Sequence, residues 1–155
     1  MLKAARITIF KARKTIVFFS ALNFLFFIGF MMLVKYTGLL HITGLRTVNY
    51  VFLTVFSLLH INRLIKELKG YIPFLQVMSI TFFTGTISFF LFSIFLFFYS
   101  FSDPYLNSMF IMDTEGMSRL VPPLLVFFEG SGISIIVGLI TMIYSEKFSD
   151  KETAS

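Results

Sequence analysis

The 155-residue sequence contains no cysteine and no tryptophan, and only 14% of its residues are charged. The absence of cysteine excludes disulfides, cysteine metal sites and thiol catalysis. The absence of tryptophan leaves the six tyrosines to supply an aromatic belt at any lipid–water interface. Soluble domains carry about 25% charged residues. The scarcity of charge therefore argues against an ordinary soluble domain.

Hydrophobic residues, by contrast, make up 57% of the chain, and 23 residues are phenylalanine. A soluble fold of this length could not hide so much apolar surface, so we expect the bilayer to be the solvent. The net charge of +5 does not indicate nucleic-acid binding, because the basic residues flank hydrophobic runs and form no face with interleaved aromatics. The composition predicts an integral membrane protein.

Four hydrophobic runs are long enough to cross a bilayer, which takes about 20 mostly apolar residues in a helix. They cover residues 16–34, 48–65, 72–99 and 122–144. The third run is longer than one crossing requires, so it could tilt or extend beyond the membrane. The fourth opens with two prolines, which suit a helix start because their missing amide hydrogens would have had no partner there. We therefore expect an all-α, single-domain, four-helix transmembrane bundle with one sizeable outer loop, residues 101–120.

The basic residues lie mostly on one side of these spans. Ten of the thirteen fall in the first 14 residues, between the second and third spans, or in the C-terminal tail, whereas three lie on the other side: Lys35, Arg46 and Arg119. The positive-inside rule then places both termini in the cytoplasm. The basic start followed by an apolar run resembles a signal peptide, but the run is too long and lacks a small-residue cleavage site, so we interpret it as an uncleaved span. Residues 1–14 could lie on an anionic leaflet or form a disordered tail.

Glu129 is the only acidic residue inside any of the hydrophobic runs. A charge at membrane depth costs roughly 2.5–3.5 kcal/mol on insertion scales, so something must offset that cost. Counting 1.5 Å per residue separates Glu129 from His60 by roughly 12 Å along the membrane normal, which argues against a direct pair. Lys35 ends the first span on the same side as Glu129, and a lysine side chain can reach back toward depth. We therefore expect a Glu129–Lys35 ion pair.

Three interpretations of Glu129 remain open at this stage. It could be a paired or hydrogen-bonded carboxyl that holds the bundle together, a contact to another subunit, or a proton- or cation-handling group in a transport path. Against transport, the other spans contain no acid, and discontinuous-helix transporters usually show breaks in both halves.

Small and polar residues recur on one face of the third and fourth spans. Because lipid tails are as apolar as leucine, helix association in membranes needs close packing of small residues or polar contacts. We expect these two helices to lie against each other, within one chain or between copies, through two sets of residues: Thr81, Gly85 and Ser88, and Gly130, Ser134 and Gly138.

The first and second spans carry fewer polar residues, among them Asn23, Ser57 and His60. Ser57 and His60 share a helix face that should turn inward, so Asn23 and His60 join Glu129 and Lys35 as candidate intramembrane polar residues. A hydrogen bond within the bundle is a better interpretation of His60 than a metal site, which needs several converging ligands. The other histidine, His41, falls in a loop on the opposite side.

The sequence contains no phosphate-binding loop, metal-ligand helix pair or nucleophile motif, so we expect no catalysis and no cofactor. The second half contains Asp103-Pro104-Tyr105 after the third span and Phe128-Glu129-Gly130, Ile140 and Tyr144 in the fourth. Through these residues the chain resembles an uncharacterised family (a domain of unknown function) of small bacterial four-helix integral membrane proteins. The resemblance covers about half of the chain. The resemblance implies a bacterial inner-membrane location and carries no activity.

Size, composition and sparse polar content together predict a non-catalytic accessory or structural subunit of a larger inner-membrane complex. Its expected partners are the lipid bilayer and other membrane-protein subunits or a second copy of itself, and not nucleic acid. The alternative is a small oligomeric proton- or cation-coupled transporter or channel that uses Glu129.

Overall fold

The computed structural model describes residues 2–39, 47–68, 72, 74–103 and 120–145. These residues form four α-helices and no strand: α1 (Leu2–Tyr36), α2 (Val48–Leu68), α3 (Phe74–Ser102) and α5 (Val121–Tyr144). Each helix contains a segment long and apolar enough to cross a membrane, namely Ala12–Tyr36, Val48–Lys66, Phe74–Ser102 and Val121–Tyr144. The predicted all-α architecture with four potential spans is confirmed.

The helix bounds differ from the predicted spans mainly at the N-terminus. α1 begins at Leu2 and continues without a break to Tyr36, so residues 2–14 extend the first span as a helix and are not a disordered tail. α5 carries Pro122 and Pro123 in its first turn, as expected for residues whose ring replaces an amide hydrogen with no helical partner. The predicted outer loop lies largely outside the described residues.

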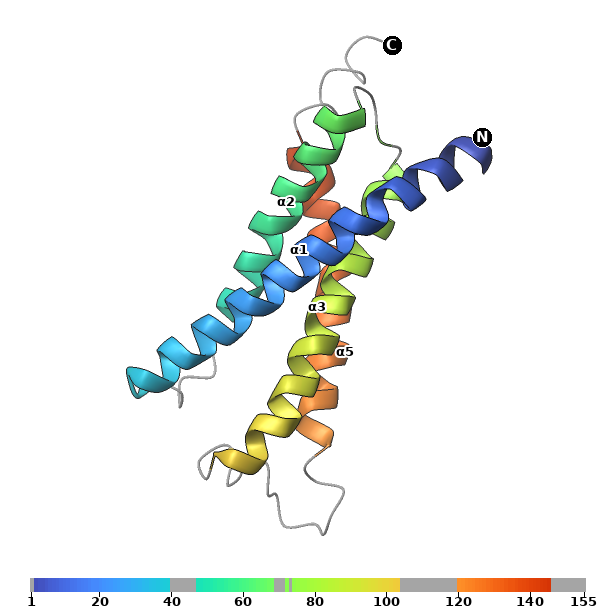
Figure 1. Ribbon diagram of the computed structural model, residues 1–155. Coiled ribbons are helices and arrows are strands. Elements are labelled where there is room, and N and C mark those ends of the chain that lie inside the picture. Colours follow the sequence, from blue (N-terminus) through green and yellow to red (C-terminus); the bar gives the residue numbers. More distant parts are fainter. Residues whose placement is uncertain (1, 40–46, 69–71, 73, 104–119, 146–155) are drawn as a thin grey trace.

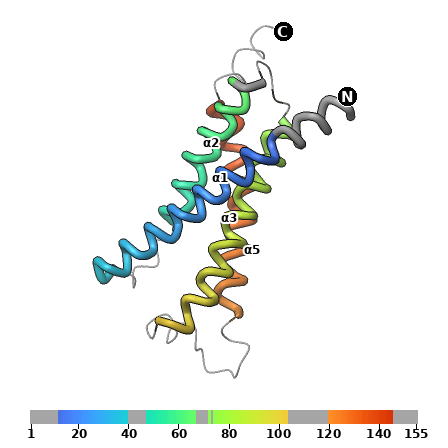
Figure 2. The backbone as a smooth tube through the Cα atoms, in the orientation of Figure 1, coloured from blue at the N-terminus to red at the C-terminus, as the bar shows by residue number. Residues whose placement is uncertain are grey.

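The helices follow the order α1–α2–α5–α3 around the bundle. α3 and α5 pack most extensively, whereas α2 and α3 touch little. α1 and α5 lie on opposite sides of the α2–α3 pair (Figure 1). α1 starts, and α2 and α5 finish, at one end of the bundle, which we name the terminal end; the opposite end is the loop end. α1 crosses α2 and α3 obliquely, and α1 and α3 diverge toward the loop end (Figure 2).

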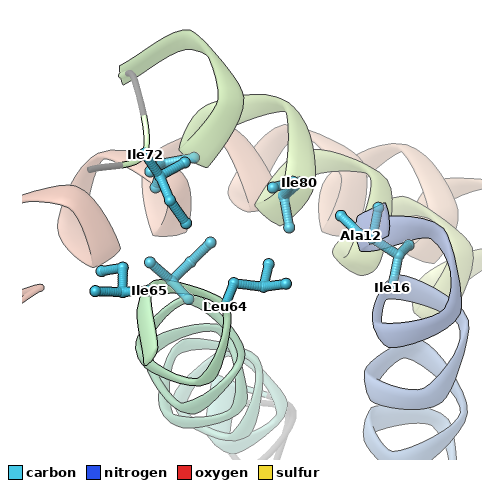
Figure 3. Close-up of a cluster of buried hydrophobic side chains, with 8 residues drawn as sticks. Ala12, Ile16, Leu64, Ile65, Ile72 and Ile80 are labelled. Atoms are coloured by element: carbon cyan, nitrogen blue, oxygen red, sulfur yellow. The ribbon is translucent and has the colours of Figure 1, made fainter. Parts of the chain in front are cut away.

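The interior contains two hydrophobic clusters. The terminal-end cluster joins α1, α2, α3 and the residue Ile72 just before α3; Figure 3 shows Leu64 and Ile65 of α2 facing Ile72, with Ala12 and Ile16 of α1 beyond. The loop-end cluster is dominated by aromatic rings and consists of Phe27, Leu53, Phe89, Phe92, Leu96 and Val137. Ring contacts such as Phe27–Phe89, with centroids 4.9 Å apart, join α1 to α3 within it.

Buried polar residues separate the two clusters along α1, α2 and α3. We call these residues, together with Ser134 of α5, the polar layer. Each residue of the layer is at most 1% exposed; the members are Ser20, Asn23, Ser57, His60, Thr81, Thr84, Ser88 and Ser134. Large apolar side chains face outward on all four helices, for example Phe128 and Ile143, each 66% exposed. A polar interior with an apolar exterior is the arrangement that a hydrocarbon solvent favours.

Candidate functional site

Glu129 is half-buried on α5, toward the loop end of the bundle. The phenol of Tyr50, in the first turn of α2, donates a hydrogen bond to Glu129 Oε1. This bond joins two neighbouring helices. A buried polar group that lacks a hydrogen-bond partner is costly, so the phenol offsets part of the cost of placing the Glu129 carboxyl group in this interface.

Lys35 lies in the last turn of α1, at the loop end. Its ammonium forms an ion pair with Asp103, the residue that follows α3, and donates a hydrogen bond of 2.7 Å to the hydroxyl of Tyr99. Lys35 Nζ also lies 5.0 Å from the centre of the Tyr99 ring, within the range of a cation–π contact. Asp103 is 4% exposed, so the pair ties α1 to a buried carboxylate just after α3.

The predicted Glu129–Lys35 ion pair is wrong. Lys35 is paired with Asp103, and the Glu129 carboxyl accepts its hydrogen bond from Tyr50. The order of the helices gives the reason, because α1 and α5 lie diagonally across the bundle and α1 packs against α2 and α3. Two residues that are predicted to lie at similar depth do not meet when their helices are diagonal to each other.

His60 lies in the polar layer, where its ring contacts α1 and α3. Nε2 is 3.0 Å from the hydroxyl of Thr15, and Nδ1 is 3.4 Å from the hydroxyl of Thr84. The ring stacks on Phe19, with centroids 4.5 Å apart and planes 15° apart. His60 therefore hydrogen-bonds within the bundle, as predicted. Tyr50, which bonds Glu129, lies ten residues before His60 in α2, about 15 Å along the helix.

Serine hydroxyls link α1 and α3 reciprocally beside His60. Ser20 donates a 3.1 Å hydrogen bond to the carbonyl of Thr84, and the hydroxyl of Ser88 lies 3.3 Å from the carbonyl of Ser20 and 2.6 Å from that of Thr84. Ser88 was grouped with the face that meets α5, but its hydroxyl bonds toward α1. It lies at the boundary of two interfaces because α3 packs against both helices.

The predicted seam between α3 and α5 is confirmed. A side chain at Gly85 would overlap the hydroxyl of Ser134, and one at Gly130 would overlap the ring of Phe89. At Gly138 an added Cβ would lie 2.9 Å from the sulfur of Met78. The small residues therefore let the two helices approach closely within one chain. Thr81, also assigned to this face, is 1% exposed.

Asn23 is fully buried, and neither its amide oxygen nor its amide nitrogen has a hydrogen-bond partner among the described residues. The same holds for the hydroxyls of Ser57 and Thr81. The polar layer thus combines bonded members, centred on His60, with members whose polar atoms are enclosed and unmatched.

Three residues that contact Glu129 or Lys35 were not predicted as site residues: Tyr50, Tyr99 and Asp103. The tyrosines were assigned to an interfacial belt, and Asp103 entered only among the residues that carry the family resemblance. A usable signal was present for Asp103, since an acid one residue past α3 and a lysine ending α1 stand at the same end of the bundle. The Tyr50 contact depends on which helices are neighbours, which no local pattern encodes.

Comparison with family models, curated proteins and solved structures found no match to this chain. The resemblance to a family of unknown function therefore stays a prediction. Among the described residues, no group of three or more histidine, aspartate or glutamate side chains is placed to hold a metal ion. The site is thus defined by its own geometry: two polar contacts toward the loop end, and a polar layer between two hydrophobic clusters.

Proposed function

We propose that this chain is a non-catalytic integral membrane protein that acts as a small accessory or structural subunit of a larger bacterial inner-membrane complex. The observation that supports this most directly is the set of bonds that Glu129 and Lys35 make near the loop end. Glu129 bonds α2 to α5, and Lys35 bonds α1 to the end of α3. Both groups link neighbouring helices of the same chain.

Other polar contacts also link neighbouring helices of the chain. His60 joins α2 to α1 and α3, and the glycine–serine seam joins α3 to α5. Every neighbouring pair in the order α1–α2–α5–α3 is thereby connected by a polar bond or a close approach. A bundle in which polar contacts link each helix to its neighbours is suited to be a scaffold, and its apolar exterior is available to lipid and to other membrane helices.

Native purification tests the proposal. We expect the protein, solubilised gently from its own membrane, to co-purify with other membrane proteins in fixed stoichiometry. Recovery as a lone monomer or dimer under conditions that preserve known complexes of the same membrane would overturn the subunit assignment.

A transport role for Glu129 is the competing outcome, and a separate assay identifies it. The purified protein and its Glu129→Gln variant would be reconstituted in liposomes with a proton or monovalent-cation gradient. Flux that depends on the carboxyl group would favour a transporter or channel. The structural proposal expects no flux above that of empty liposomes, and equal behaviour of the two proteins.

A further inference from the structure

Exposed basic side chains stand at the terminal end of two neighbouring helices. They are Lys14 of α1 and Arg63 and Lys66 of α2, and we name them the basic patch. Other faces of the same turns carry buried residues of the terminal-end cluster, among them Ile16 and Leu64 (Figure 3). The basic patch therefore belongs to the outer surface of the bundle.

The contact between α1 and α2 sets the level of the patch. The two helices run in opposite directions, and Nε2 of His60 lies 3.0 Å from the hydroxyl of Thr15. Lys14 directly precedes Thr15, toward the terminal end. Arg63 and Lys66 follow His60 by about 4.5 and 9 Å along α2, also toward the terminal end. All three basic residues thus lie on the terminal-end side of this contact.

An apolar stripe extends from each lysine toward the loop end. Each stripe consists of the lysine and two apolar residues, at intervals of four and seven residues that return to one helix face: Lys14, Phe18 and Leu25 on α1, and Lys66, Leu59 and Val55 on α2. The four apolar side chains are 47–61% exposed. Each stripe rises about 16.5 Å at 1.5 Å per residue, close to half of the roughly 30 Å hydrocarbon core. The stripes thus match one lipid leaflet in length and polarity.

The two stripes are neighbours on the outer surface of the α1–α2 pair. On α1, Thr15 faces α2 and Ser20 bonds α3. On α2, His60 faces α1 and Tyr50 bonds α5. The stripes occupy the remaining, outward face of each helix. Because α1 and α2 are in contact, one ligand on this surface can reach both stripes.

The chemistry of the surface selects the ligand. Residues 1–20 contain five basic and no acidic residues, and residues 60–70 contain three basic residues against one acid, Glu67. Guanidinium and ammonium groups both bind phosphate, the former in a bidentate manner. A free anion would contact only the cations and leave the apolar stripes uncovered. A phospholipid with a net negative headgroup matches both parts of the surface.

We propose that the basic patch binds the phosphate of an anionic phospholipid, whose acyl chains lie along the two apolar stripes. Basic residues beside a membrane span attract anionic lipids, and the bilayer presents the headgroup at the level of the patch. The site lies at the opposite end of the bundle from the Glu129 and Lys35 contacts. It does not depend on the proposed subunit role, because lipid can bind here with or without protein partners.

Native mass spectrometry of the purified full-length protein tests this site. The delipidated protein in mild detergent would be titrated with phosphatidylglycerol and, separately, with phosphatidylcholine that has the same acyl chains. We expect tighter binding of phosphatidylglycerol. Lys14→Gln and Lys66→Gln should each weaken it about fivefold, the effect of one cation beside an anionic headgroup, and leave phosphatidylcholine binding unchanged. Equal affinity of the unsubstituted protein for the two lipids would overturn the proposal.

Arg13→Gln is the matched control for Lys14→Gln, because it removes the same charge one residue away. Arg13 is also exposed, but it precedes Ser20 by seven residues and so shares the face of α1 that bonds α3. We expect a clearly smaller loss of phosphatidylglycerol affinity for Arg13→Gln than for Lys14→Gln. Equal losses would show a diffuse attraction to the basic end and would overturn the site.

Free phosphate and an acidic protein segment are the alternative occupants. Displacement of phosphatidylglycerol by an equal concentration of inorganic phosphate would show that the stripes contribute nothing, and would overturn the site. Lipid binding that survives Lys14→Gln and Lys66→Gln, with loss of a co-purifying protein, would assign the patch to a protein and overturn it too. Melting temperatures in phosphatidylcholine check the fold of each variant. Should a glutamine variant not fold, Lys14→Ala or Lys66→Ala gives the same comparison.

Discussion

The Glu129 carboxyl group, which lies within the apolar helix α5, accepts a hydrogen bond from a tyrosine hydroxyl. Tyr50 reaches Glu129 from the neighbouring helix α2, and its ring lies 6.1 Å from that of Phe89, centroid to centroid. Phe89 is in turn packed over Gly130, the residue next to Glu129. The bond is therefore set in the same interface as the close α3–α5 approach, so substitutions at Glu129 should report on bundle stability.

We predict that Glu129→Gln is mild and Glu129→Leu is harsher. Glutamine keeps an acceptor for the Tyr50 phenol and loses only the charge, a cost of about 1 kcal/mol, whereas leucine removes the acceptor and costs about 1–3 kcal/mol. The free energy of unfolding in mixed detergent micelles measures both. The double variant Tyr50→Phe/Glu129→Leu should recover part of the loss, because neither partner then remains. Equal effects of the glutamine and leucine variants would show that the bond to Tyr50 does not stabilise the fold.

The Lys35–Asp103 pair should respond asymmetrically to loss of either partner. Asp103 is 4% exposed, whereas the Lys35 side chain is 43% exposed. Lys35→Met withdraws the ammonium from a buried carboxylate, and Asp103→Asn leaves a lysine that reaches water and can still donate to the asparagine oxygen. We expect a clearly larger fall in melting temperature for Lys35→Met than for Asp103→Asn. The reverse order would mean that the lysine is the member that depends on its partner.

At the scale of helices, the α3–α5 seam provides a prediction with an internal control. An added methyl group at Gly85 or Gly130 would overlap Ser134 or Phe89, whereas nothing lies within 4 Å of the position at Gly132. Overpacking of this kind typically costs about 1–3 kcal/mol. We expect Gly85→Ala and Gly130→Ala to lower the free energy of unfolding by that amount.

Gly132→Ala should be neutral or slightly stabilising, because alanine forms helix more readily than glycine. Chemical or detergent denaturation of the three variants side by side measures the difference. If all three glycines tolerate alanine equally, the close approach of α3 and α5 is not a source of stability.

The elements also show what the sequence could predict. The four helices and the small-residue faces of α3 and α5 follow from local periodicity, which is visible in the chain itself. The partner of Glu129 depends on which helices become neighbours, and the α1–α2–α5–α3 order is a property of the assembled bundle. Lys35 illustrates the consequence, since its position at the end of the first helix was predicted and its partner was not. Asn23 was predicted to be an intramembrane polar residue, but only the folded bundle shows that its amide is fully buried and unmatched among the described residues.

At the scale of the whole molecule, the bundle inverts the arrangement of a soluble protein. Polar residues form a layer in the interior, while outward positions carry large apolar side chains such as Leu75, 73% exposed, and Phe98, 65% exposed. Exposing such a surface to water is unfavourable, so the exterior of the bundle favours a hydrocarbon solvent. The orientation of the bundle in the bilayer then depends on the basic residues, most of which belong to the terminal end and its connections.

The absence of native cysteine makes this orientation directly measurable, because any single introduced cysteine is the only thiol in the chain. Thr37 is exposed at the loop end, just after α1, and Ser149 lies in the C-terminal tail. With ten basic residues on one side against three on the other, the positive-inside rule predicts that a membrane-impermeant maleimide labels Thr37→Cys in intact cells. Ser149→Cys should react only after the membrane is permeabilised. The opposite pattern would invert the orientation and place Lys35 and Asp103 on the cytoplasmic side.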